Sequence, residues 1–283
     1  MTYKREQKTT LVLGGTGKTG RRVVERLTAR GLRTLVGSRS GEPPFDWEDR
    51  STWRRVLADV DRVYVSYYPD LAAPGAVETV GSFAELAVSS GVPRLVLLAG
   101  RGEAEAEFAE QAVRDSGADL TIVRSTWFAQ NFSEDYLLEH LLSGAVAVPA
   151  GDTPEPFVDA DDIADIAVAA LTDDRHIGEL DELTGPRLLT FAEAVEEISA
   201  AAGREISYVP VSIEDHAAAA TEQGVPGEVV DFLTYLFSEV LDGRNAHVTD
   251  GVQRALGREP RDFADYAREA AATGVWKPSA MAA

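Results

Sequence analysis

Short apolar runs alternate with longer segments of helical periodicity through the first half of the chain. The runs predict strands at 11–13, 33–37, 62–66, 94–98 and 119–123, and the segments predict helices at 21–27, 75–90 and 103–115. Strands that alternate with helices in this way form right-handed βαβ units with parallel strands. In such sheets ligands bind at the carboxyl ends of the strands.

The pattern changes after residue 131, where helical segments dominate. Helices are predicted at 131–142, 161–171, 190–202, 226–240 and 261–272, with short strands at 146–148, 156–158, 179–184 and 205–210. The short Ala-rich run 217–220 also favours a helix. The sequence therefore predicts an α/β fold, a Rossmann-type doubly wound parallel sheet with a smaller, mostly helical C-terminal substrate lobe.

Three glycines follow the first predicted strand at three-residue spacing. In a dinucleotide site the first glycine makes a tight turn, the second lets backbone approach the pyrophosphate, and the third lets the helix pack on the strand. The helix N-terminus then faces the phosphates. A P-loop would need a glycine five positions before Gly17, where this chain has Val12, so that class is excluded. The residues expected to bind the cofactor here are Gly14, Thr16, Gly17, Lys18, Thr19 and Gly20.

The residues after the second predicted strand indicate which dinucleotide binds. An NAD-selective site places an acid here for the ribose 2′-hydroxyl, whereas arginine suits a 2′-phosphate. This chain has Ser38 and Arg39, and its next acid, Glu42, lies beyond the strand end. We expect NADP(H) as cofactor, held in part by Ser38 and Arg39; the alternative for Arg39 is a solvated loop residue.

Composition limits the other partners. The chain has 283 residues and a net charge of −20, which argues against nucleic-acid binding. It has no cysteine and therefore no disulfide or thiol chemistry, and no uninterrupted apolar run long enough for a membrane span. The first ten residues lack the apolar part of a signal peptide. We expect a cytoplasmic protein with a small-molecule substrate and no membrane partner; the oligomeric state stays open. Residues 1–150 are assigned to the NADP-binding domain, and 151–283 to a mixed region that completes its core and forms the smaller substrate lobe.

Several blocks together resemble the NmrA-like branch of the atypical short-chain dehydrogenases. They lie at 11–20, 92–98, 116–124, 127–132 and 157–164, and the segments 242–252 and 258–264 are similar to a subgroup with bacterial relatives of ergot-alkaloid iminium reductases. The resemblance implies a Rossmann domain that holds NADP(H) and a small lobe over the nicotinamide. Members reduce quinones, conjugated double bonds or iminium ions, or sense redox state without turnover.

The chain departs from the family pattern at three places. A serine usually found near the end of the 94–98 strand is missing from the stretch that contains Ala99, which we assign to the cofactor site. Ser125 stands where proline is expected, and Gln130 where an acid is expected. These changes leave the chemistry less defined than the fold.

Ordinary short-chain dehydrogenases use a Tyr-x-x-x-Lys pair for proton transfer, and this chain has none. Its lysines are Lys4, Lys8, Lys18 and Lys277, and no tyrosine lies four residues before any of them. Carbonyl–alcohol interconversion by that device is excluded, whereas an iminium ion needs only hydride at carbon. Tyr67 and Tyr68 follow the 62–66 strand, so Tyr67 is assigned to the cofactor site and Tyr68 is a candidate proton donor. The alternative for both is aromatic packing before Pro69.

Aromatic residues after the 119–123 strand are expected to line the substrate pocket. They are Trp127, Phe128, Phe132 and Tyr136, with core packing as the alternative for two of the first three. Tyr136 and His140 share a helix face at i, i+4, which suggests an acid–base pair or a hydrogen-bonded one.

Other polar residues favour structural roles. Asp159, Asp161 and Asp162 precede a helix and suit its dipole, and Glu103 with its neighbours reads as the solvated start of another. The histidines show no mutual ligand spacing, so no metal is expected.

The sequence thus favours an NADPH-dependent reductase that delivers hydride to an electrophilic carbon of a small aromatic or polycyclic molecule. An imine or iminium is the first choice, and a quinone or enone the second. The alternatives are a catalytically silent NADP(H)-binding redox sensor and a non-redox cyclase or isomerase on the same fold.

Overall fold

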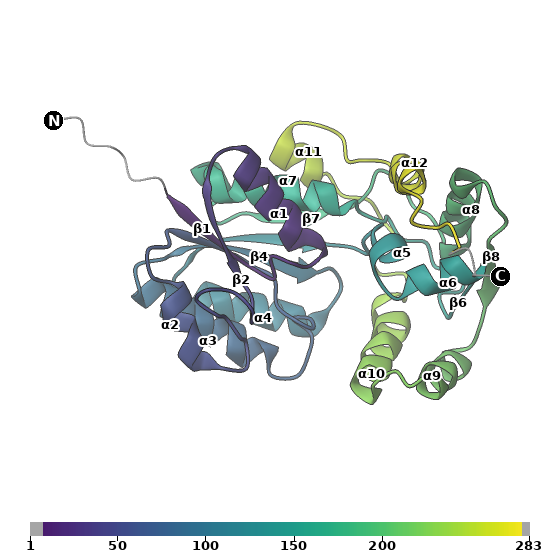
Figure 1. Ribbon diagram of the computed structural model, residues 1–283, viewed down its shortest axis with the longest axis horizontal. Coiled ribbons are helices and arrows are strands. Elements are labelled where there is room, and N and C mark those ends of the chain that lie inside the picture. The colour runs from purple at the N-terminus through teal and green to yellow at the C-terminus, as the bar shows by residue number, and fades with distance from the viewer. Residues whose placement is uncertain (1–7, 279–283) are drawn as a thin grey trace. The chain divides into compact units, whose positions relative to one another are not determined.

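The computed structural model describes residues 8–278, which form two compact units interleaved along the chain (Figure 1). The first, here the sheet unit, contains the residues up to Ser125 together with Ala160–Leu183 and Gly251–Arg258. The second, here the helical unit, contains Thr126–Asp159, Thr184–Asp250 and the residues from Glu259 onward. None of the described helices combines the length and the apolar character needed to cross a membrane.

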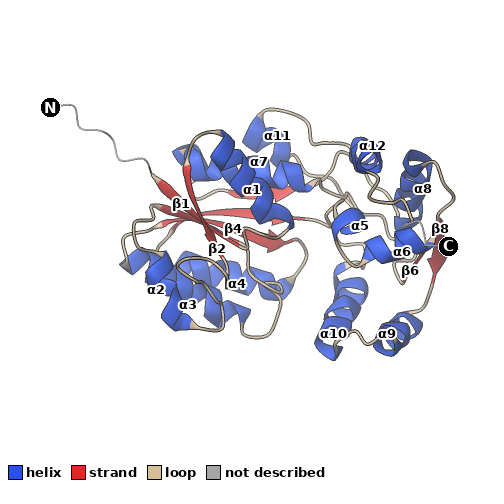
Figure 2. Ribbon diagram, in the orientation of Figure 1, coloured by secondary structure: helices blue, strands red, loops and turns tan. Residues whose placement is uncertain are grey.

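The sheet unit is built on six parallel strands flanked by helices, as Figure 2 shows. The strands lie in the order β2-β1-β3-β4-β5-β7. Their bounds are β1 Thr9–Leu13, β2 Arg33–Gly37, β3 Arg62–Val65, β4 Arg94–Gly100, β5 Asp119–Ser125 and β7 Leu180–Leu183. The chain leaves β1 toward β2 and later returns on the other side to β3, so the topological switch lies between β1 and β3. A doubly wound parallel sheet binds its ligand beside such a switch, at the carboxyl ends of the strands.

Helices cover both faces of this sheet. One face carries α1 Lys18–Ala29, α7 Ala160–Thr172 and α11 Gly251–Leu256, and the other carries α2 Trp53–Val56, α3 Ala76–Ser89 and α4 Ala104–Asp115 (Figure 1). Because both faces are covered, β1 and β3 are buried along their whole length, which explains why they read as continuous apolar runs. The predicted Rossmann-type parallel sheet is confirmed.

The helical unit contains a second, two-stranded parallel sheet of β6 Ala145–Val148 and β8 Ser207–Pro210. Its helices are α5 Asn131–Glu134, α6 Leu137–Ser143, α8 Phe191–Ala202, α9 Ile213–Glu222, α10 Gly227–Tyr235 and α12 Phe263–Thr273. A π-helical turn at Leu236–Val240 follows α10, and 3₁₀ turns occur in the sheet unit at Arg50–Thr52 and Asp174–His176. A cluster of aromatic rings around Phe132 and Phe191 forms its core.

Two of the predicted elements differ in the structure, and a third forms as predicted but joins the main sheet. The helix predicted at 131–142 is two helices, because the backbone at Asp135 is extended. The strand predicted at 156–158 is only an isolated bridge between Val158 and Phe128. The strand predicted at 179–184 does form, as β7, and it joins the main sheet beside β5. Consequently α7, β7 and α11 belong to the sheet unit although they follow residue 150.

A buried ion pair fastens α4 to β5 in the sheet unit. Glu110 is fully buried, and both of its carboxylate oxygens accept hydrogen bonds from Arg124, at 2.9 and 2.6 Å. Because the two bonds are parallel and charge-assisted, they fix the orientation of the helix on the strand. Removing Glu110 would leave a largely buried guanidinium with only weaker partners, Glu107 at 3.4 Å and Glu182 at 3.9 Å.

We expect Glu110→Ala to lower the free energy of unfolding by about 3–5 kcal/mol, since it leaves a buried charge without its main partner. Glu78→Ala is the matched control: it removes the same charge from an exposed pair with Arg50, for which a loss below about 1 kcal/mol is expected. Urea unfolding of the two variants and the wild type measures both values. Equal, small losses would contradict the role assigned to the pair.

Candidate functional site

The turn between β1 and α1 leaves no room for side chains at two of its glycines. Gly14 has a φ of +67°, which favours glycine, and its carbonyl accepts a hydrogen bond from the N–H of Gly17 at 2.9 Å. A Cβ on Gly20 would lie 2.2 Å from the carbonyl oxygen of Gly14. These two glycines are therefore needed by the fold itself, because they let α1 begin directly against the end of β1.

Gly17 differs from them in degree, because a Cβ there would make a single tight contact, with the backbone carbonyl oxygen of Gly14, and no overlap. It is exposed, its φ is −81°, and the nearest atom to a Cβ would be 3.3 Å away. It is the N-cap of α1, so the space beyond it faces the N–H groups of the first helical turn. A side chain would fill the space that a phosphate needs to reach this turn. The site therefore fits a dinucleotide pyrophosphate.

The other residues of this loop take different positions. Thr16 is exposed, and Lys18 is half-buried. The side chain of Thr19 is buried, and its hydroxyl accepts a hydrogen bond from Tyr64 at 2.9 Å. Thr19 can therefore meet a ligand only through its backbone, as the second residue of α1.

Ser38 and Arg39 follow the last residue of β2. The Ser38 carbonyl accepts the N–H groups of Gly41 and Phe45, which folds the loop after the strand back on itself. Arg39 is exposed, and its guanidinium has no ion-pair partner within residues 8–278. Because it forms no ion pair with the described residues, the guanidinium of Arg39 is available to an anionic ligand.

The remaining residues assigned to the cofactor site lie at the ends of the next two strands. Ala99 is buried in β4, one residue before its end. Tyr67 is half-buried, and its ring packs 5.0 Å from that of Trp47. Tyr68 is 79% exposed. All the residues assigned to the cofactor therefore follow β1, β2 and β3 or end β4, at the carboxyl edge of one sheet.

Glu103 is buried, which corrects the expectation of a solvated helix start there. Only 6% of it is exposed, and its carboxyl fills the space beside Gly100, where a Cβ would fall 2.2 Å from Oε1. Burial and the neighbouring Asp70 carboxyl raise the pKa of Glu103 to about 9. The glycine three residues before it was the only sequence signal of this packing. Glu105 and Glu107 are exposed as expected.

The aromatic residues assigned to substrate binding all belong to the helical unit. Phe132 is fully buried, with the rings of Phe157 and Phe263 5.5 and 5.6 Å away, so core packing accounts for it. Trp127 lies at the margin of the same cluster and is 9% exposed. Phe128 is half-buried.

The expected pairing of Tyr136 with His140 is wrong. The Tyr136 hydroxyl is buried without a hydrogen-bond partner in the described part of the chain, and burial raises its pKa. His140 instead accepts the backbone N–H of Ala147 through Nδ1, at 3.4 Å.

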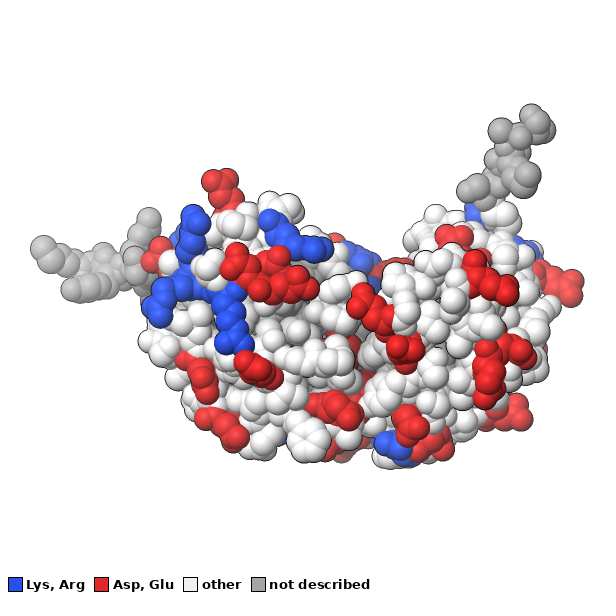
Figure 3. Space-filling view, turned by 90° about the horizontal axis from the view of Figure 1, so that it is seen from below, with Lys and Arg blue, Asp and Glu red and all other residues white. Residues whose placement is uncertain are grey.

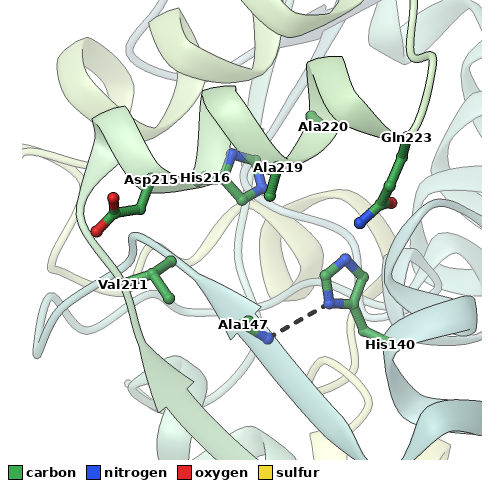
Figure 4. A pocket seen from close by; sticks show the side chains of 8 residues that line it. All are labelled: His140, Ala147, Val211, Asp215, His216, Ala219, Ala220 and Gln223. Carbon is green, nitrogen blue, oxygen red and sulfur yellow. Dashed lines mark hydrogen bonds between the residues drawn. The ribbon is translucent and has the colours of Figure 1, made fainter.

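His140 lines a small cavity of about 130 Å³ together with His216 of α9 (Figure 4). Burial lowers the pKa of both imidazoles, and the proximity of His140 lowers that of His216 further. The two histidines are far apart in the sequence, so spacing alone did not reveal that they share a cavity.

The acidic residues around position 160 form ion pairs with arginines. Asp161 binds Arg26 at 2.5 Å and Arg22 at 3.2 Å, and Asp162 binds Arg258 at 2.7 Å. These pairs connect α1 and the segment after α11 to the start of α7. Asp159, in the helical unit, accepts a hydrogen bond from the Gln130 side chain at 2.9 Å. Within residues 8–278 no three His, Asp or Glu side chains form a metal-binding group.

The surface is strongly acidic. On the face drawn in Figure 3, Asp and Glu side chains are widely spread, whereas Lys and Arg are fewer and lie mainly toward the left of the view. This distribution agrees with the net charge of −20.

Comparison with known proteins agrees with this geometry. A model of the NmrA-like family matches residues 107–267, more than half of the 283-residue chain. The chain is 32% identical to agroclavine dehydrogenase from Claviceps fusiformis, over 91% of this chain and 96% of that protein. It is 30% identical to NAD(P)H azoreductase from Xenophilus azovorans, over 93% of this chain and 98% of that protein.

Solved structures show the same fold. The NADPH-dependent quinone oxidoreductase of Escherichia coli in complex with NADPH aligns with a TM-score of 0.76 at 19% identity, over 92% of this chain and 99% of that one. The resemblance seen in the sequence is confirmed: this chain belongs to the NmrA-like family.

Proposed function

We propose that this protein, an NAD(P)H-dependent oxidoreductase of the NmrA-like family, uses NADPH to reduce an electrophilic carbon of a small aromatic or polycyclic molecule. An imine or iminium is the preferred acceptor class, and a quinone or enone the second. The relatives named above support NAD(P)H-dependent redox chemistry on a small molecule, since they are an agroclavine dehydrogenase and an NAD(P)H azoreductase.

The observation that carries the proposal is the glycine at the start of α1. A Cβ on Gly17 would lie 3.3 Å from the carbonyl oxygen of Gly14, a tight contact without overlap, and Gly17 is the N-cap of α1, where a ligand phosphate would approach the helix. The first helical turn would hold the pyrophosphate, and Arg39 with Ser38 would hold a 2′-phosphate at the end of β2. Bound there, the cofactor supplies a hydride.

The chain's own contribution to the chemistry is orientation and the exclusion of water. No tyrosine is followed four residues later by a lysine, so the usual proton-transfer device is missing. Trp127, at the margin of the aromatic cluster, is our candidate for a substrate contact. The neutral ring face suits a planar acceptor.

We expect Arg39→Ala to weaken NADPH binding by about 2 kcal/mol, or about 30-fold in Kd, and to leave NADH binding unchanged. Arg33→Ala is the matched control, because Arg33 is also exposed but stands at the opposite end of β2. Titration calorimetry with both cofactors measures the effect. Equal affinity of the wild type for NADPH and NADH would contradict the 2′-phosphate site.

We expect Gly17→Val to abolish the binding of both cofactors in a folded protein, because its side chain occupies the phosphate space. Gly227→Val is the control: Gly227 also begins a helix, and nothing lies within 4 Å of its Cβ position. Circular dichroism and thermal unfolding establish that both variants fold. Retained cofactor affinity in folded Gly17→Val would place the dinucleotide site elsewhere.

Tyr68→Phe should slow the reduction of a preformed iminium only slightly, since hydride transfer to that carbon needs no donated proton. Loss of a general acid that the reaction does use would cost roughly 100-fold or more. Steady-state kinetics with NADPH and a cyclic iminium distinguish the two. A complete loss of turnover, with cofactor and substrate still bound, would make the Tyr68 hydroxyl essential.

A further inference from the structure

The cavity that His140 and His216 share lies under α9 in the helical unit. It is bounded by α9 on one side and by His140 of α6 and Ala147 of β6 on the other (Figure 4). Its volume of about 130 Å³ approaches that of protein cavities of about 150 Å³ that bind benzene. The space is therefore large enough for a single ring.

The sequence of α9 explains why this space is not filled. The half-buried residues of the helix are spaced i, i+3, i+4 and i+7 and share one inner face: Ile213, His216, Ala217 and Ala220. None of the residues of α9 is fully buried. Because alanine side chains are short, the Ala-rich run leaves a gap where larger apolar side chains would pack against β6.

His140 presents a hydrogen-bond donor to the cavity. Its Nδ1 atom accepts the backbone N–H of Ala147 at 3.4 Å. A neutral imidazole has one N–H and one lone pair, so the proton of His140 is on Nε2. In Figure 4 this nitrogen points away from Ala147, toward the side of the cavity that carries Gln223. A ligand atom that meets Nε2 must therefore be an acceptor, and a metal ion would not bind there.

His216 and Gln223 add further polar groups to the lining. The ring of His216 rests edge-on against that of Phe237, with 5.6 Å between the centroids. Neither the His216 ring nor the Gln223 amide has a hydrogen-bond partner among residues 8–278. Each of the two side chains can donate and accept, so a ligand in the cavity can pair with them.

The charges around the cavity favour an uncharged ligand. Burial lowers the pKa of both His140 and His216 below the ordinary value of 6.5, so the two rings are neutral at pH 7.5. The charged residue of the lining is Asp215, which is exposed and would repel an anion. The donor on His140 disfavours a cation in the same way. The remaining walls, such as Val211 and Ala220, are apolar and suit a ring.

We propose that this cavity is a binding site for an uncharged single-ring molecule that bears a carbonyl or hydroxyl oxygen. The ring lies against the alanine and valine side chains, and the oxygen accepts the Nε2–H of His140. A donor group of the ligand pairs with His216. The site belongs to the helical unit alone, so ligand binding needs neither NADPH nor turnover and does not depend on the proposed function.

Benzamide is the probe, because its carbonyl and amide groups match the two histidines. Binding is followed at pH 7.5 by NMR of protein with labelled histidine, in which four residues give signals. We expect benzamide to shift the signals of His140 and His216 and to leave those of His176 and His247 unchanged. Benzoate and benzylammonium have a similar size but carry a charge, and each should bind about tenfold more weakly or worse.

Variants of α9 locate the site. Ala220→Leu fills the cavity and should abolish the shifts. Ala218→Leu is the matched control, since Ala218 belongs to the same run but is exposed and outside the lining, and it should leave binding unchanged. His216→Phe keeps a ring against Phe237 without its nitrogens and should raise the Kd about tenfold. Circular dichroism and thermal unfolding establish that each variant folds.

No shift of the His140 and His216 signals up to the solubility of benzamide would overturn the site. Tighter binding of benzoate or benzylammonium than of benzamide would overturn the uncharged class. Unchanged binding in folded Ala220→Leu, or equal losses in Ala218→Leu and Ala220→Leu, would overturn the cavity as the place of binding. If Ala220→Leu does not fold, His216→Phe decides, and an unchanged Kd there overturns the proposal.

Discussion

The sheet unit depends on the contact between the carbonyl of Gly14 and the backbone of Gly20. With only 2.2 Å between that oxygen and a Cβ on Gly20, no other residue fits without moving α1 away from β1. Because of this close contact, α1 begins at the carboxyl edge of the sheet, where its first N–H groups can bind a phosphate. Gly17, the N-cap of α1, has no side chain that would block access to these N–H groups.

Ion pairs hold the elements that carry this edge. Arg26 reaches Asp161 and Asp165, and Arg258 reaches Asp162 and Asp165, so α1, α7 and the segment after α11 share one charge network. Glu110 and Arg124 do the same for α4 and β5 on the other face. Because these pairs are partly buried, they are screened less than surface pairs. The loops at the carboxyl edge therefore extend from helices and strands that these ion pairs hold in place.

Local patterns were sufficient to predict the parallel sheet. The strand predicted at 33–37 matches β2, because a short run with β-branched residues between two glycines favours a strand over a helix. The single helix predicted at 131–142 is divided into two, since the extended backbone at Asp135 interrupts the helix although the periodic pattern continues. The burial of Glu103 could not be predicted, because it depends on Gly100 and on the loop that contains Asp70, which lies more than 30 residues away in the sequence. The cavity shared by His140 and His216 depends in the same way on distant segments that pack together.

Isotope labelling can follow the transfer of hydride from NADPH to the acceptor carbon. NADPH deuterated at C4 on one face or the other is incubated with the protein and a cyclic imine, and the product is analysed by mass spectrometry and NMR. We expect one of the two samples to deliver a single deuterium to the former imine carbon. Consumption of NADPH without deuterium in the product from either sample would contradict it, as would tight NADPH binding with no oxidation by any acceptor.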